Sequence, residues 1–283
     1  MFWAILKALE QGYKVRTSVR NLSKEKQLRG SLVLSSDKLT KDIVDSNLEL
    51  FIADLVSDDG RSENFDNVDY VLHIASPFPA AQPEDPNDIV IPAVQGTLRI
   101  LKAAGKVTSV KQVVITSSFA SNAYLQSKTI AEQEAWKYVK DNNVSFDLTV
   151  FNPAYIFGPP LKNGTGFPTS LLMLQKLLNG TQKDGVPSLY MSIVDVRQLA
   201  DLHLEALTNP KAKGERFITH AGPNLSLLEA LPEDQTKNLP TKELEGAKDY
   251  RKPSDVSKVK ATFNWTPYTI EKSFVDTVEA FEI

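Results

Sequence analysis

Short, nearly continuous apolar runs alternate along this chain with segments whose apolar residues recur at the spacing of a helix. The runs resemble strands that are buried on both faces, and they lie at 48–53, 70–75, 113–118 and 146–151. Helical spacing is found at 3–10, 88–104 and 129–142. Strands buried on both faces need helices above and below their sheet. The alternation therefore predicts an α/β fold built on a doubly wound parallel sheet.

Composition excludes several classes of function. With 42% apolar and 24% charged residues, the 283-residue chain has the make-up of a soluble globular protein. Its net charge of −3 argues against nucleic acid or an anionic membrane as partner. It has no cysteine, and its three histidines are scattered, so we expect no disulfide, thiolate nucleophile or metal site. Without a leader or a membrane span, the expected compartment is the cytoplasm, and the expected state is a monomer or homodimer.

Polar residues or proline stand where the predicted strands end. Asp54, Ser76, Ser118 and Pro153 all occupy such positions. In an open parallel sheet, ligands bind beyond the carboxyl ends of the strands. The coincidence predicts a binding site along this edge.

The run at 113–118 delivers Ser118 to that edge, and Tyr124 and Lys128 follow on one helical face. A serine, a tyrosine and a lysine that converge can polarise a carbonyl group and give it a proton. A second Tyr-x-x-x-Lys motif, Tyr268 to Lys272, has no such setting, and we interpret it as the start of a surface helix.

The first segments predict how a nucleotide would be bound. The helix at 3–10 closes at Gly12, and a strand at 13–19 ends at Arg20, with Lys24 close behind. A helix, a glycine and a strand in this order are typical of a dinucleotide-binding crossover, in which the residue after the strand meets the adenosine ribose. Arginine there suits a 2′-phosphate, whereas an acid suits a free 2′-hydroxyl. The alternative is an ordinary solvated basic run.

These patterns predict two parts. Residues 1–152 are expected to form a dinucleotide-binding domain. Residues 153–283 begin with a Gly- and Pro-rich loop and continue with a helix at 169–178 and a strand at 216–219. We expect them to form mainly a smaller, mixed substrate-binding lobe, with some segments returning to the sheet.

Six motifs, taken together and in this order, resemble those of the extended short-chain dehydrogenase/reductases. They are Leu-His-Ile-Ala-Ser-Pro-Phe (72–78), Ile-Pro-Ala-Val-Gln-Gly-Thr (91–97), Val-Val-Ile-Thr-Ser-Ser (113–118), Tyr-Leu-Gln-Ser-Lys (124–128), Asn-Pro-Ala-Tyr-Ile-Phe-Gly-Pro (152–159) and Val-Asp-Val-Arg (194–197). The resemblance covers almost the whole chain and is strongest to the dihydroflavonol-reductase-like branch with the fungal ketone and methylglyoxal reductases. It implies a Rossmann-like sheet, an NADP(H) cofactor and reduction of a small ketone or aldehyde.

The resemblance also implies roles for individual residues. Ser118, Tyr124 and Lys128 would form the catalytic set, the last two also touching the cofactor. Arg20 and Lys24 would bind the 2′-phosphate of NADPH. Further cofactor contacts would come from Asp54, Leu55, Ala75, Ser76, Thr116, Pro153, Ile156 and Ser170, and substrate contacts from Phe78 and Tyr155.

Two departures from the family pattern leave other hypotheses open. Met1 is expected to fall inside the helix that follows the glycine-rich loop, so the first strand and this loop are expected to be absent. Only residues 119–123 separate Ser118 from Tyr124, whereas members of the family have a longer segment between the corresponding residues. The sequence is then either incomplete or that of a truncated, non-catalytic dinucleotide-binding or scaffold relative. A sugar-nucleotide epimerase or dehydratase is a third hypothesis, which Arg20 disfavours.

Overall fold

The computed structural model describes residues 2–57, 63–76, 85–118, 123–164, 169–181, 185, 190–222, 225–226, 231, 233–237, 239, 242 and 254–281. The chain divides into two compact units. The first comprises Met1–Asn152 and Ala200–Phe217, and the second comprises Pro153–Leu199 and Ile218–Ile283. What each unit binds stays a prediction.

The first unit opens with a two-stranded parallel sheet and three helices. The elements are α1 (Phe2–Glu10), β1 (Val15–Val19), α2 (Glu25–Leu34), α3 (Lys41–Asn47) and β2 (Leu48–Ile52). Val15 pairs with Leu48, and Val19 with Ile52. Gly12 ends α1 with φ +82°, a left-handed conformation that glycine adopts without strain. The predicted helix and its terminal glycine are therefore confirmed.

A four-stranded sheet follows in the order β3-β4-β5-β9. Its elements and connections are η1 (Glu63–Phe65), β3 (Tyr70–His73), α4 (Asn87–Gly105), β4 (Gln112–Thr116), α5 (Ala123–Asp141), β5 (Asp147–Pro153), η2 (Pro210–Ala212) and β9 (Arg216–Thr219). The β3–β4 and β4–β5 pairs are parallel. All five residues of β4 are buried, in agreement with the apolar run Val113, Val114 and Ile115 at its centre. The α/β fold with parallel strands is confirmed, whereas the expected lack of a preceding strand and glycine loop stays a prediction.

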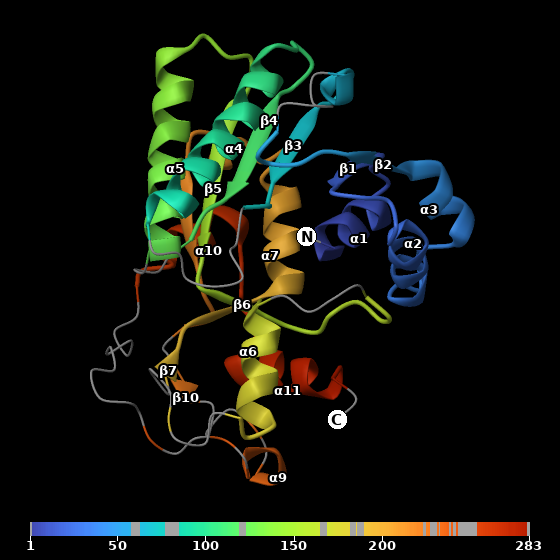
Figure 1. Ribbon diagram of the computed structural model, residues 1–283, viewed down its shortest axis with the longest axis vertical. Helices are drawn as coiled ribbons and strands as arrows, with labels where there is room; N and C mark the ends of the chain where they lie inside the picture. Colours follow the sequence, from blue (N-terminus) through green and yellow to red (C-terminus); the bar gives the residue numbers. More distant parts are fainter. Residues whose placement is uncertain are drawn as a thin grey trace. The chain divides into compact units, whose positions relative to one another are not determined.

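Two long helices cover one face of this sheet. Figure 1 shows α4 and α5 side by side along β3, β4 and β5. The core beneath them is formed by Phe65, Leu101, Ala103, Ala104, Val110, Val113, Ile115, Ala135, Phe146, Leu148 and Val150. Burial of this apolar surface is the main force that holds α5, and hence Lys128, against the end of β4.

The second unit is a mixture of short strands and helices. It contains β6 (Tyr155–Phe157), α6 (Thr169–Leu178), β7 (Tyr190–Met191), β8 (Ile193–Asp195), β10 (Leu225–Ser226), α9 (Glu233–Thr236), α10 (Ser257–Phe263) and α11 (Ile270–Glu279). The β6–β8 pair is parallel and the β7–β10 pair antiparallel. Helix α7 (Val196–Glu205) begins in this unit and continues into the first. The core packs Phe157, Ile193 and Phe274 against apolar residues of α6.

Three element boundaries differ from the predicted ones. Strand β4 ends at Thr116, so Ser118 lies two residues beyond it. Helix α5 begins at Ala123, which puts Tyr124 and Lys128 on one helix as predicted and extends the pattern seen at 129–142 toward the N-terminus, because alanine, leucine, glutamine and lysine in this stretch favour a helix. Tyr268 precedes α11, whose first turn is capped by the Thr269 side chain.

No helix among the described residues combines the length and the apolar character needed to cross a membrane.

Candidate active site

The predicted cofactor residues of the first unit lie just after the strands. Arg20 follows β1 and Lys24 lies four residues further, both with exposed side chains. Asp54 and Leu55 follow β2. Since β1 and β2 are parallel, these ends lie at the same edge of their sheet. Ala75 and Ser76 follow β3 in the same way, at the edge of the other sheet.

The Lys128 side chain extends from α5 to the end of β4 and is buried, with 8% of the residue's surface exposed. Its Nζ lies 2.8 Å from the Thr116 carbonyl oxygen, to which it donates a hydrogen bond. Burial lowers the pKa of Lys128 to about 8, because an ammonium group loses hydration inside the protein. The side chain is therefore still mostly charged at pH 7, but it can lose its proton in mildly alkaline solution.

Ser118 follows the same end of β4 and is partly buried. Its carbonyl oxygen accepts a hydrogen bond from Asn152 Nδ2 at 3.3 Å. Tyr124 is the second residue of α5, one turn before Lys128, and its side chain lies outside the described part of the structure. The structure therefore brings Ser118 and Lys128 to one strand end and places the Tyr124 backbone on the helix that carries Lys128.

The Thr116 side chain turns to the interior rather than to the sheet edge. Its Oγ1 lies 2.7 Å from His203 Nε2, and the His203 ring stacks on Phe151 at 4.7 Å between centroids. His73 is likewise buried, 3.3 Å from the Thr97 hydroxyl, as expected of a satisfied core histidine. The contact of Thr116 with a cofactor stays a prediction.

Glu132 is a buried acid at this strand end that the sequence did not single out, with 6% of its surface exposed. Its Oε1 accepts from Arg216 Nε and its Oε2 from Asn152 Nδ2, both at 2.7 Å. Burial acts to raise the pKa of Glu132, but hydrogen bonds from Arg216, Ser117 and Asn152 outweigh it and keep the pKa below its ordinary value. The only signal in the sequence is its spacing, one helical turn after Lys128.

A small cavity of about 10 Å³ lies beneath these residues. It is lined by His73, Thr97, Ile115, Thr116, Ser117, Lys128, Ala131 and Glu132. This volume admits about one water molecule, so the cavity is too small for a carbonyl substrate.

The loop after β2 is held by its own backbone and by α4. Asp54 Oδ1 accepts from the Val56 N–H at 3.2 Å, and Arg99 Nη1 donates to the Leu55 carbonyl at 3.0 Å. Arg99 therefore positions the residues expected beside the adenine.

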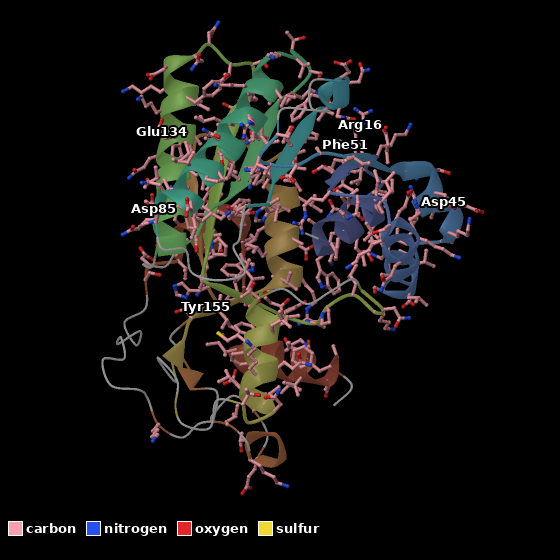
Figure 2. All side chains as sticks on the ribbon, viewed as in Figure 1. Arg16, Asp45, Phe51, Asp85, Glu134 and Tyr155 are labelled. Carbon is pink, nitrogen blue, oxygen red and sulfur yellow. The ribbon has the colours of Figure 1, made fainter. Side chains whose placement is uncertain are left out.

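The second unit holds the remaining predicted contacts. Pro153 is buried at the end of β5, and Tyr155, labelled in Figure 2, is 44% exposed. The Ser170 hydroxyl donates to the Ile156 carbonyl at 2.7 Å, so α6 and β6 bring these two residues together. Phe78 lies outside the described residues. Among the described residues, no cluster of histidine and acidic side chains could hold a metal ion.

Comparisons with known proteins agree with this architecture. Residues 4–121 match the model of the NAD dependent epimerase/dehydratase family. The chain is 30% identical to cinnamoyl-CoA reductase of Medicago truncatula, covering 99% of this chain and 91% of that protein. It is also 30% identical to a bifunctional dihydroflavonol 4-reductase/flavanone 4-reductase of Malus domestica, with coverages of 98% and 86%. Its structure resembles the yeast methylglyoxal/isovaleraldehyde reductase crystallised with NADPH, at a TM-score of 0.82, 26% identity and coverages of 99% and 95%.

Proposed function

Because the chain belongs to the extended short-chain dehydrogenase/reductases, within the NAD dependent epimerase/dehydratase family, we propose that it reduces a ketone or aldehyde to an alcohol with NADPH. The observation that supports this most is Lys128, which is buried one helical turn after Tyr124 and hydrogen-bonded to the last residue of β4, two residues before Ser118. The named relatives at 30% identity are reductases.

The donor set at the first sheet fits NADPH. Arg20 and Lys24 are exposed cations after β1, and a planar guanidinium can bind two oxygens of a 2′-phosphate. Asp54 and Leu55 follow the neighbouring parallel strand, where the adenine is expected. NADPH, when bound, supplies the hydride that the carbonyl carbon accepts.

Residues of the protein supply the proton that the carbonyl oxygen accepts. Tyr124 protonates the carbonyl oxygen as general acid. The Lys128 ammonium stabilises the negative charge that remains on the tyrosine once it has given up its proton. The Ser118 hydroxyl donates a hydrogen bond to the oxygen as negative charge develops on it. The cytoplasmic compartment, the monomeric or homodimeric state and the identity of the carbonyl substrate stay predictions.

The test compares the two Tyr-x-x-x-Lys motifs. Tyr124→Phe keeps the ring but removes the proton, so carbonyl-dependent oxidation of NADPH should fall by roughly 10²–10⁴-fold. Tyr268→Phe serves as the matched control and should leave turnover unchanged, since Tyr268 precedes a helix of the second unit. The assay follows NADPH absorbance with small ketones and aldehydes. Equal activity of the Tyr124 variant and its parent would refute the assignment.

A further inference from the structure

We propose that Glu132 is a positioning residue of the reductase site, which fixes Ser118 relative to α5 through the side-chain amide of Asn152. This inference rests on the function proposed above. Glu132 and Asn152 are buried, with exposed fractions of 6% and 0%. They connect the helix that carries Lys128 with the residue that follows β4.

The connection is a continuous chain of hydrogen bonds. Asn152 Nδ2 donates to Glu132 Oε2 at 2.7 Å and to the Ser118 carbonyl oxygen at 3.3 Å. The Ser117 side chain also hydrogen-bonds to Glu132, and the Ser117 N–H donates to the Phe151 carbonyl at 2.7 Å. The carboxylate therefore joins the end of β4 to β5 at the point where Ser118 leaves the sheet.

The residue at 132 has to be an acceptor on both oxygens. The groups that face it are the Arg216 guanidinium, the Asn152 amide and the Ser117 hydroxyl, all of which can donate. A carboxylate accepts at either oxygen, whereas a glutamine amide would turn an NH₂ group toward a donor. Because the pKa of Glu132 stays lowered despite burial, the charged form is the one present near neutral pH.

Glu132 also determines which way the Asn152 amide faces. Both bonds of Nδ2 go to oxygen acceptors, so the nitrogen has to lie on the side of Glu132 and Ser118. Asn152 Oδ1, on the other side, is buried and has no hydrogen-bond partner among the described residues. If Glu132 became an amide, the Asn152 amide could turn over to gain a partner for Oδ1. Its oxygen would then face the Ser118 carbonyl and push it away.

The same helix carries the rest of the catalytic set. Tyr124, Lys128 and Glu132 follow one another at intervals of one turn along α5, on the same face. The hydrogen bonds that hold Glu132 against the strand ends therefore also fix the position of Lys128, along the axis of α5, relative to Ser118. The Ser117 Oγ lies 3.4 Å from the Lys128 carbonyl and adds a weak contact at this level.

The test begins with Glu132→Gln in the full chain, measured with NADPH and a reducible ketone. Misplacement of reacting groups lowers turnover, so kcat should fall by about 10- to 100-fold, while KM for NADPH stays close to that of the wild type. Glu134→Gln is the matched control, because Glu134 lies on the same helix, partly exposed, as labelled in Figure 2. The control should keep wild-type kcat. A Glu132→Gln variant with wild-type kcat, or with a raised KM and unchanged kcat, overturns the inference.

A double-mutant cycle separates positioning from general loss of stability. If Glu132 acts through Asn152, then Glu132→Gln combined with Asn152→Ala should lower kcat no further than the more damaging single change does. If the fold-decrease in kcat of the double variant equals the product of the two single decreases, Glu132 does not act through Asn152, and the inference is overturned. If Glu132→Gln does not fold, Glu132→Asp takes its place in the cycle, since it keeps the charge but shortens the side chain. A decrease in kcat no larger than that of the worse single variant again supports the inference, and a multiplicative decrease overturns it.

A different result distinguishes failure of the proposed reductase function from failure of the inference about Glu132. A folded wild-type chain that reduces no ketone or aldehyde with NADPH refutes the reductase assignment. The link between Glu132 and Asn152 is then tested by the same cycle on the free energy of unfolding in urea. Non-additive losses support the hydrogen-bonded connection, and additive losses overturn it.

Discussion

Arg197, the last residue of the Val-Asp-Val-Arg motif, gives a prediction that does not depend on activity. Its Nε and Nη2 contact the two oxygens of Asp195 at 2.8 and 2.6 Å, and its Nη1 contacts Asp276 Oδ2 at 2.6 Å. The Asp195 side chain is 1% exposed. Partial burial acts to raise the pKa of Asp276, but hydrogen bonds from Lys272 and Arg197 outweigh it, so the pKa is lowered. Arg197 therefore stabilises the charged form of Asp276 and forms two close contacts with the buried Asp195 carboxylate.

Arg197→Met keeps much of the side-chain volume but removes the guanidinium. Asp195 would then be left as a buried charge, to which the backbone N–H of residue 197 still donates a hydrogen bond. Removal of one partner from a buried ion pair costs about 3–5 kcal/mol of unfolding free energy. At roughly 2–4 °C per kcal/mol, the melting temperature should fall by about 6–20 °C.

Lys272→Met is the matched control, because Lys272 contacts the same Asp276 oxygen at 2.9 Å. Its side chain is 50% exposed, and a pair of this kind contributes only about 0–1 kcal/mol. Urea unfolding followed by circular dichroism compares the two variants. Adding Asp195→Asn to Arg197→Met should recover part of the loss, since it removes the uncompensated charge. An Arg197→Met variant no less stable than Lys272→Met would refute the reasoning.

Two further predictions concern the cofactor and the pH dependence. Arg20→Asp should weaken NADPH binding far more than NADH binding, because a guanidinium that can bind the 2′-phosphate is replaced by a carboxylate that repels it. Titration of both cofactors checks this, and equal losses of affinity would contradict it. In the wild type, kcat/KM for NADPH should fall as the pH rises through about 8, where Lys128 loses its proton. Lys128→Arg should move this decline to higher pH, and an unshifted decline would show that another group titrates.

The parts of the fold that the sequence predicted are those governed by local pattern. The helix at 169–178 and the strand at 216–219 are found with the bounds expected for them. Strand β4 is buried along its whole length, so every position has to be apolar or internally bonded. Periodicity and burial of this kind are visible in any short window of residues.

The buried polar contacts could not be predicted in the same way. Glu132 meets Asn152, 20 residues away, and Arg216, 84 residues away. Thr116 and His203 are 87 residues apart and 2.7 Å from one another. A glutamate on a helix is usually solvated, and only the packing of α5 against three strand ends makes this one an internal acceptor. Such contacts depend on the tertiary arrangement, which no single segment encodes.

The two Tyr-x-x-x-Lys motifs show why the setting decides the chemistry. Lys272 is half exposed, pairs with Asp276 and lies 5.5 Å from the Tyr268 ring centroid, so water and the paired carboxylate screen its charge. Lys128 is buried against a neutral backbone carbonyl, and burial lowers its pKa to about 8. An ammonium group in low dielectric acts more strongly on a neighbouring phenol than a solvated one does. We therefore expect the same four-residue spacing to support proton transfer at Tyr124 and Lys128, and only surface contacts at Tyr268 and Lys272.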